Sequence, residues 1–137
     1  MKTVFLDSSF FKAVIDPKDD FYSPARKIWQ TFLDNKYPLV TTNYILDETY
    51  TLIRSKCDLK KSLELRDVLG TRKIDLSVIR VTIDDDAAAW EWFEKDWSKL
   101  SFTDCVSFAV MKRLGITDAA TFDEHFTRAG FTIVRSL

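Results

Sequence analysis

The sequence is poor in cysteine, glycine and proline. Among its 137 residues are two cysteines, three glycines and three prolines. Two cysteines that lie far apart, Cys57 and Cys105, argue against a disulfide-stapled scaffold. So little glycine and proline excludes a low-complexity or loop-rich chain. The hydrophobic share of 46% suffices for a buried core, so we expect one domain that spans residues 1–137.

The chain also lacks long hydrophobic runs and a net charge. The apolar run that starts at Val4 is interrupted at Asp7, which makes it too short for a signal peptide, and no window is long enough to span a bilayer. We therefore expect a cytoplasmic protein without membrane contact. The formal net charge is −1, so a nucleic-acid ligand would have to be held by local basic patches and bound cations.

The hydrophobic pattern predicts strands that alternate with helices. Strands are expected at residues 2–6, 38–42, 76–82, 119–122 and 131–134. Helices are expected at residues 8–15, 19–35, 43–56, 60–73, 84–97, 101–114 and 123–129. This alternation is typical of a mainly parallel sheet that is covered on both faces. The predicted fold class is therefore α/β, with a three-layer α/β/α sandwich.

Two aspartates stand directly after predicted strands. Asp7 follows the first strand and Asp123 follows the fourth, and each precedes a predicted helix. Ligands of open α/β sheets bind beyond the carboxyl ends of the strands. If the two strands are parallel neighbours, both carboxylates point into one crevice. Each aspartate also fits the simpler role of a helix N-cap.

Two further acids lie inside predicted helices. Glu48 shares an apolar helix face with Ile45, where a charge is costly unless it is compensated; the simpler alternative is snorkelling or a buried basic partner. The neighbouring Asp47 is turned about 100° away. Asp104 lies in the first turn of its helix, where a capping box with Ser101 is the simpler alternative. No such alternative explains all four acids together.

A metal ion would explain the four acids. Clustered carboxylates raise one another's pKa, and a divalent cation removes their repulsion. Oxygen ligands favour Mg²⁺ or Mn²⁺, and the single histidine, His125, is expected at the surface, so zinc is disfavoured. A hard cation can activate water and stabilise charge on a phosphodiester. The pattern leaves open whether one ion or two would bind.

Four short motifs carry these acids. They are the segments 4–9 (VFLDSS), 41–49 (TTNYILDET), 100–105 (LSFTDC) and 120–126 (ATFDEHF). In their order and spacing they resemble the PIN domain, and most closely the small VapC-type toxins of toxin–antitoxin pairs. The resemblance covers nearly the whole chain, and its specificity lies in the order and spacing because each motif alone is weak.

The resemblance implies a PIN-like sandwich and metal-dependent cleavage of RNA. It implies that the metal-site acids are Asp7, Glu48, Asp104 and Asp123, and that the supporting hydroxyls belong to Ser8, Thr103 and Thr121. It also implies a homodimer and a cognate antitoxin that occludes the site. The fourth acid is open, because Asp118 or Glu124 is an alternative to Asp123. The motifs do not identify which RNA is cut.

Two other functions are alternatives to this interpretation. One is a non-catalytic PIN-fold module that binds RNA or protein. Another is a phosphotransfer fold with Asp7 as nucleophile, but the second acid that haloacid-dehalogenase-like phosphatases need is replaced by Ser9. A cysteine nucleophile at Cys105 is not expected, because no base is placed to activate it.

The aromatic residues are open to two interpretations. Trp90, Phe93 and Trp97 recur at helical spacing and predict a core stripe, whereas Trp92 falls off that stripe and is a candidate for stacking on a base or contacting a partner. The early helices carry many aromatic residues, which are either ordinary core or a groove for an antitoxin or dimer partner: Phe10, Phe11, Tyr22, Trp29 and Phe32.

Overall fold

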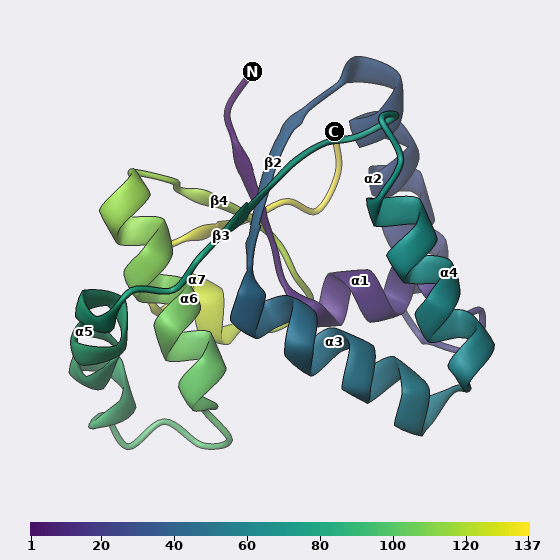
Figure 1. Ribbon diagram of the computed structural model, residues 1–137. Coiled ribbons are helices and arrows are strands. Elements are labelled where there is room, and N and C mark those ends of the chain that lie inside the picture. The colour runs from purple at the N-terminus through teal and green to yellow at the C-terminus, as the bar shows by residue number, and fades with distance from the viewer.

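Strands and helices alternate along the chain in the computed structural model, which describes all 137 residues (Figure 1). The strands are β1 (Val4–Leu6), β2 (Pro38–Thr42), β3 (Asp75–Ile79), β4 (Asp118–Ala120) and β5 (Thr132–Ile133). The helices are α1 (Ser8–Ile15), α2 (Tyr22–Asn35), α3 (Asn43–Lys56), α4 (Leu59–Leu69), α5 (Ile83–Phe93), α6 (Phe102–Leu114) and α7 (His125–Arg128). None of these helices combines the length and apolar character that a membrane crossing requires.

The five strands form one sheet in the order β3-β2-β1-β4-β5, and every neighbouring pair is parallel. The chain first moves outward from β1 through β2 to β3, and then returns to the other side of β1 to form β4 and β5. The direction of winding therefore reverses between β1 and β4. Such a switch point leaves a crevice at the carboxyl ends of its two strands, where α/β proteins bind their ligands.

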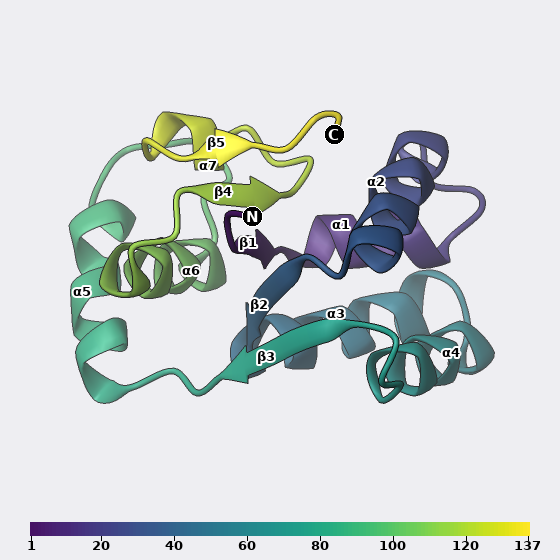
Figure 2. The ribbon, with the colours of Figure 1, turned by 90° about the horizontal axis from the view of Figure 1, so that it is seen from above.

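Helices cover both faces of the sheet. Figure 2 shows α1 to α4 on one side of the strands and α5 and α6 on the other, with α7 next to α6. All three residues of β1 are buried, as a central strand between two helical layers requires. The buried aromatic side chains of α1 and α2 include Phe10 and Trp29, which lie in the main core. The predicted three-layer α/β/α sandwich is confirmed.

Several predicted boundaries differ from the observed ones. The fourth strand ends at Ala120 instead of residue 122, so Thr121 to Asp123 form a loop beyond it. The third strand ends at Ile79, because the Val81 N–H donates to the Asn43 side chain at 2.8 Å instead of extending the sheet. The helix α3 begins at Asn43, and its N-cap is Thr42, whose hydroxyl accepts from the Ile45 N–H.

The predicted aromatic core stripe is wrong in two of its three members. Trp90 is 50% exposed and Phe93 is 39% exposed, so neither belongs to the core. Both rings lie at the edge of the contact between α5 and α6, 5.3 Å from the ring of Phe102. Trp92, which was expected off the stripe, packs against Phe108 of α6 with ring centroids 5.6 Å apart. The helix is therefore rotated relative to the prediction. This rotation places Ala89 and Trp92 on its inner side.

Candidate active site

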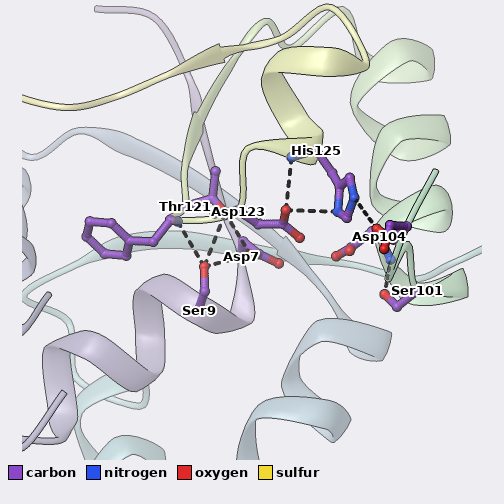
Figure 3. Close-up of polar contacts among 9 residues, drawn as sticks. Asp7, Ser9, Ser101, Asp104, Thr121, Asp123 and His125 are labelled. Carbon is purple, nitrogen blue, oxygen red and sulfur yellow. Dashed lines mark hydrogen bonds and ion pairs between the residues drawn. The ribbon is translucent and has the colours of Figure 1, made fainter. Parts of the chain in front are cut away.

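Three aspartates from three distant parts of the sequence converge at the switch point between β1 and β4 (Figure 3). Asp7 follows the last residue of β1, Asp104 lies in the first turn of α6, and Asp123 lies in the loop after β4. The parallel pairing of β1 with β4 brings the first and third of these together, which meets the condition that the sequence had left open. The first turn of α6 then faces the same crevice.

Asp7 is the most buried of these acids, with 2% of its surface exposed. It stands at the N-cap position of α1, but its side chain makes no capping hydrogen bond. Instead, its Oδ2 accepts from the hydroxyls of Ser9 at 2.9 Å and Thr121 at 2.8 Å. Its Oδ1 is buried and has no hydrogen-bond partner. Burial raises its pKa, which the two hydroxyls partly oppose. The N-cap alternative therefore does not account for this carboxylate.

Ser9 and Thr121 connect the start of α1 to the loop after β4. The Thr121 hydroxyl accepts from the Asp123 N–H at 3.0 Å, and the Ser9 hydroxyl accepts from the Phe122 N–H at 3.0 Å. The supporting position expected for Thr121 thus has a physical basis in two contacts. The hydroxyl beside Asp7 comes from Ser9, and not from Ser8, the residue that the resemblance indicated. Sequence reasoning missed Ser9, although the paired serines were the available signal.

Asp104 is 8% exposed. Burial raises its pKa to about 9, and the charges of Asp7 and Asp123 add to the shift. The Ser101 hydroxyl accepts from the Asp104 N–H at 3.0 Å, so one half of the expected capping box is present. That hydrogen bond uses the backbone of Asp104 and leaves its carboxylate free for the site. At neutral pH, Asp104 therefore keeps a proton unless a cation replaces it.

Glu48 reaches the site from α3. Its side chain is partly buried, and its Oε2 is buried without a hydrogen-bond partner. Burial raises its pKa, the charge of Asp7 raises it further, and the neighbouring Thr103 hydroxyl opposes the shift. The adjacent Asp47 is exposed, as its helical position predicted. A buried basic partner does not explain Glu48, because no ion pair involves it. Snorkelling does not explain it either, because its Oε2 is buried.

Asp123 is the acid of its segment that lies with the others. Its Oδ1 accepts from the His125 N–H at 2.9 Å, but the N-cap residue of α7 is Glu124, so the N-cap alternative does not hold for Asp123. Asp118, an alternative, is the first residue of β4 and lies at the opposite end of the strand. Glu124, the other alternative, is exposed and pairs with Arg135 at 2.8 Å. Neither alternative points its carboxylate into the crevice.

A divalent cation fits this set of donors. The chain has four buried side-chain polar atoms without a hydrogen-bond partner, and three of them belong to this region: Asp7 Oδ1, Glu48 Oε2 and His125 Nδ1. Single ligand atoms from Asp104, Asp123 and His125 all lie within 4.8 Å of one another. Carboxylate oxygens are the ligands that Mg²⁺ and Mn²⁺ prefer. A cation would satisfy the free oxygens and remove the repulsion that raises the pKa values.

Two residues near the site differ in how well they were predicted. Cys105 is fully buried, and burial raises the pKa of its thiol to about 11, which disfavours the thiolate that a nucleophile needs. His125 was expected at the surface, but only 18% of its side chain is exposed. Its ring stacks on Trp97, with the planes 10° apart. The prediction failed because that contact joins segments that are distant in the sequence.

Known proteins resemble this chain over nearly its whole length. The PIN domain family matches residues 4–132. The 23S rRNA-specific endonuclease VapC20 of Mycobacterium tuberculosis, in strains CDC 1551 and H37Rv, is 36% identical over 138 residues, covering 96% of this chain and 98% of that protein. The crystal structure of M. tuberculosis VapC20, a sarcin-ricin loop cleaving toxin, has a TM-score of 0.85 at 33% identity, covering 97% of this chain and 99% of that one.

Two more distant structures share the fold. VapBC2 from Rickettsia felis, bound to a DNA fragment from its promoter, has a TM-score of 0.69 at 12% identity and covers 96% of each chain. FitAcB from Neisseria gonorrhoeae has a TM-score of 0.66 at 13% identity and covers 95% of each chain. The family match spans the site as well as the sheet. The chain belongs to the PIN-domain family.

Proposed function

We propose that this chain is a metal-dependent endoribonuclease and the toxin of a type II toxin–antitoxin pair. One observation carries the proposal: a buried cluster of acids whose carboxylates lack enough hydrogen-bond donors to neutralise them. The similar protein from M. tuberculosis is an endonuclease, which favours an enzyme over a non-catalytic PIN-fold module that binds RNA or protein. A pure binding module would have no use for a repulsive acidic pocket.

The proposed metal site consists of Asp7, Glu48, Asp104 and Asp123, which would hold Mg²⁺ or Mn²⁺. When bound, such an ion activates water and stabilises charge on the scissile phosphate. Ser9 and Thr121 fix the orientation of Asp7 by binding one of its oxygens, which leaves the other oxygen free. Asp104 gives up its proton when it becomes a ligand, because carboxylates bind metals in their ionised form.

The proposed substrate is ribosomal RNA. The relative with 36% identity is specific for 23S rRNA, and its crystal structure is that of a toxin that cleaves the sarcin-ricin loop. A shared sequence over the full length of both chains supports a shared substrate class. Since the chain has a net charge of only −1, contact with RNA would rest on local basic side chains and on the cation.

The remaining parts of the proposal concern the oligomeric state, the partner protein and the cellular location. We propose that residues 1–137 form one domain, that two copies form a homodimer, and that a cognate antitoxin occludes the site. The toxin character of the relative supports the antitoxin. The proposed RNA substrate supports a cytoplasmic site of action. A gene for a small DNA-binding protein directly beside the gene for this chain is the expected genetic sign of the pair.

The test is cleavage of 23S rRNA in ribosomes by the purified protein, with cut sites mapped by primer extension. Cleavage is expected with Mg²⁺ or Mn²⁺ and not with EDTA. Glu48→Gln and Asp104→Asn are each expected to lower the rate at least about a hundredfold, since a metal site contributes several kcal/mol and about 1.4 kcal/mol is a factor of ten. Asp47→Asn is the matched control and is expected to keep the wild-type rate.

The outcomes separate the parts of the proposal. Wild-type cleavage by Glu48→Gln and Asp104→Asn would overturn the assigned site. Binding of RNA without cleavage in either metal would favour the non-catalytic module. Cleavage of other RNAs but not of 23S rRNA would retain the nuclease and reject the proposed substrate.

A further inference from the structure

His125 is held in one orientation beside the acidic cluster (Figure 3). Its ring stacks on Trp97 with centroids 6.3 Å apart, and its Nε2 lies 2.9 Å from the Ser98 carbonyl oxygen. A carbonyl oxygen only accepts hydrogen bonds, so the proton of a neutral ring must sit on Nε2. The other nitrogen, Nδ1, then carries a lone pair.

That lone pair is directed at other acceptors. Nδ1 is buried, has no hydrogen-bond donor, and lies 3.0 Å from Asp123 Oδ1. Two acceptor atoms at this distance repel each other unless a positive centre lies beside them. The backbone N–H of His125 donates to the same carboxylate oxygen at 2.9 Å, but this proton does not reach Nδ1. The arrangement therefore lacks a positive charge next to Nδ1.

The spacing of these atoms suits a shared cation. Adjacent ligands of an octahedral ion with bonds of about 2.1 Å lie about 3 Å apart, which is the spacing of Nδ1 and Asp123 Oδ1. An oxygen of Asp104 lies within 4.8 Å of both. A second observation comes from Asp7, which is only 2% exposed and has an unpartnered Oδ1. In Figure 3 its carboxylate points toward Asp104.

We infer that His125 is a nitrogen ligand of the metal site, through Nδ1, together with Asp104 and Asp123. Histidines that bind metals commonly donate their second ring N–H to a backbone carbonyl, which is the role that Ser98 has here. An imidazole nitrogen favours transition-metal ions over Mg²⁺. This inference rests on the proposed function and adds that the site selects Mn²⁺ over Mg²⁺.

The competing explanation is a protonated His125 that forms an ion pair with Asp123. That explanation also supplies a positive charge, but it excludes a metal from Nδ1. The two explanations differ in whether a bound metal ion is coordinated by Nδ1 of His125. His125 is the chain's only histidine, so any imidazole signal from untagged protein comes from this residue.

The test is pulsed electron paramagnetic resonance of Mn²⁺ bound to untagged protein. The expected result is strong ¹⁴N modulation of the echo, which changes to a ¹⁵N pattern when only histidine is ¹⁵N-labelled. Labelling leaves the protein otherwise unchanged, so this readout does not depend on the folding of a variant. Bound Mn²⁺ without a histidine signal would overturn the inference and leave the proposed function intact. Failure to bind Mn²⁺ at all would overturn both.

Two variants add a thermodynamic readout. His125→Gln retains a side-chain N–H able to reach Ser98 but places no nitrogen lone pair near Asp123, whereas His125→Asn places an amide near the position of Nδ1. Calorimetry is expected to give tighter Mn²⁺ than Mg²⁺ binding in the wild type. The ratio of the two affinities is expected to fall roughly tenfold in His125→Gln. An unchanged ratio in both variants would contradict ligation by His125.

Discussion

Two aspartates of this chain have the same local sequence position and opposite surroundings. Asp85 lies three residues after the cap Thr82 of α5, and Asp104 lies three residues after the cap Ser101 of α6. Both are nearly fully buried, at 2% and 8% exposure. In both, the cap hydroxyl accepts from the backbone N–H of the aspartate, at 3.1 Å and 3.0 Å. Up to this point the two helix starts match.

They differ in what reaches each carboxylate. Asp85 accepts from the Thr82 N–H and from two nitrogens of Arg113, at 2.8 Å and 2.9 Å, so that its pKa is lowered, chiefly by Arg113. Asp104 faces Asp7 and Asp123, and its pKa is raised to about 9, chiefly by burial. The first acid holds two helices together. The second, Asp104, destabilises the folded state in the absence of a cation, as is typical of a residue in a ligand-binding site.

The strongest test of this comparison replaces each aspartate by asparagine in metal-free protein. Asp85→Asn is expected to lower the free energy of unfolding by about 2–3 kcal/mol, because it weakens the capping box and leaves Arg113 without its charged partner. Asp104→Asn is expected to raise it, because asparagine is neutral in both states, whereas Asp104 must take up a proton on folding at pH 7. Urea unfolding at pH 7 in EDTA measures both.

The cleavage activities of the two variants are expected to differ in the opposite sense to their stabilities. Asp85→Asn should retain RNA cleavage at temperatures where it stays folded, whereas Asp104→Asn should not cleave. A large loss of stability in Asp104→Asn, equal to that in Asp85→Asn, would show that both acids are structural. The contrast between the two helices would then have no functional meaning.

The same two helices show what the sequence can and cannot predict. The three-residue spacing from Ser101 to Asp104 was enough to predict the start of α6 and its cap. It was not enough to separate Asp104 from Asp85, because the difference comes from Arg113 on another helix and from Asp7 on another strand. The hydrophobic pattern predicted a parallel sheet, but the meeting of Asp7 with Asp123 depends on the pairing of β1 with β4, which the sequence left open.

Contacts between distant segments account for the errors. The hydrogen bond from Ser9 to Asp7 depends on the exact rotation of α1, and the stacking of His125 on Trp97 joins the start of α7 to the segment between α5 and α6. Helical spacing alone placed Trp90 in the core, although packing of α5 on α6 exposes half of it. Local patterns thus predicted where elements lie. They did not predict which side chains from different elements touch.

A second way to sharpen the comparison is the pH dependence of stability without metal. The folded-state pKa of Asp104 is about 9, against 3.8 for the unfolded chain, so between these values the folded state binds the extra proton. Stability therefore falls as pH rises, by up to about 1.4 kcal/mol per pH unit. Asp85 has the opposite sign: its contribution is present above 3.8 and is lost only as pH falls through its lowered folded pKa.

Urea midpoints between pH 5.5 and 8 measure this slope. In that window Asp85 is ionised in both states and adds no slope, so the decline is assigned to the acidic site. Asp104→Asn is expected to flatten it, and saturating Mn²⁺ is expected to flatten it in the wild type. A decline of equal steepness in Asp104→Asn would contradict the high pKa of this carboxyl.

The smallest expected effect separates the two serines that follow Asp7. Ser9→Ala removes a hydroxyl that donates to Asp7 and accepts from the Phe122 N–H, so we expect a loss of about 1 kcal/mol in unfolding free energy and a roughly tenfold lower cleavage rate. Ser8→Ala is the matched control, because no side-chain hydrogen bond of Ser8 supports the site, and less than about 0.5 kcal/mol is expected. A larger effect for Ser8→Ala would mean that the family pattern, and not the observed contact, identifies the hydroxyl that orients Asp7.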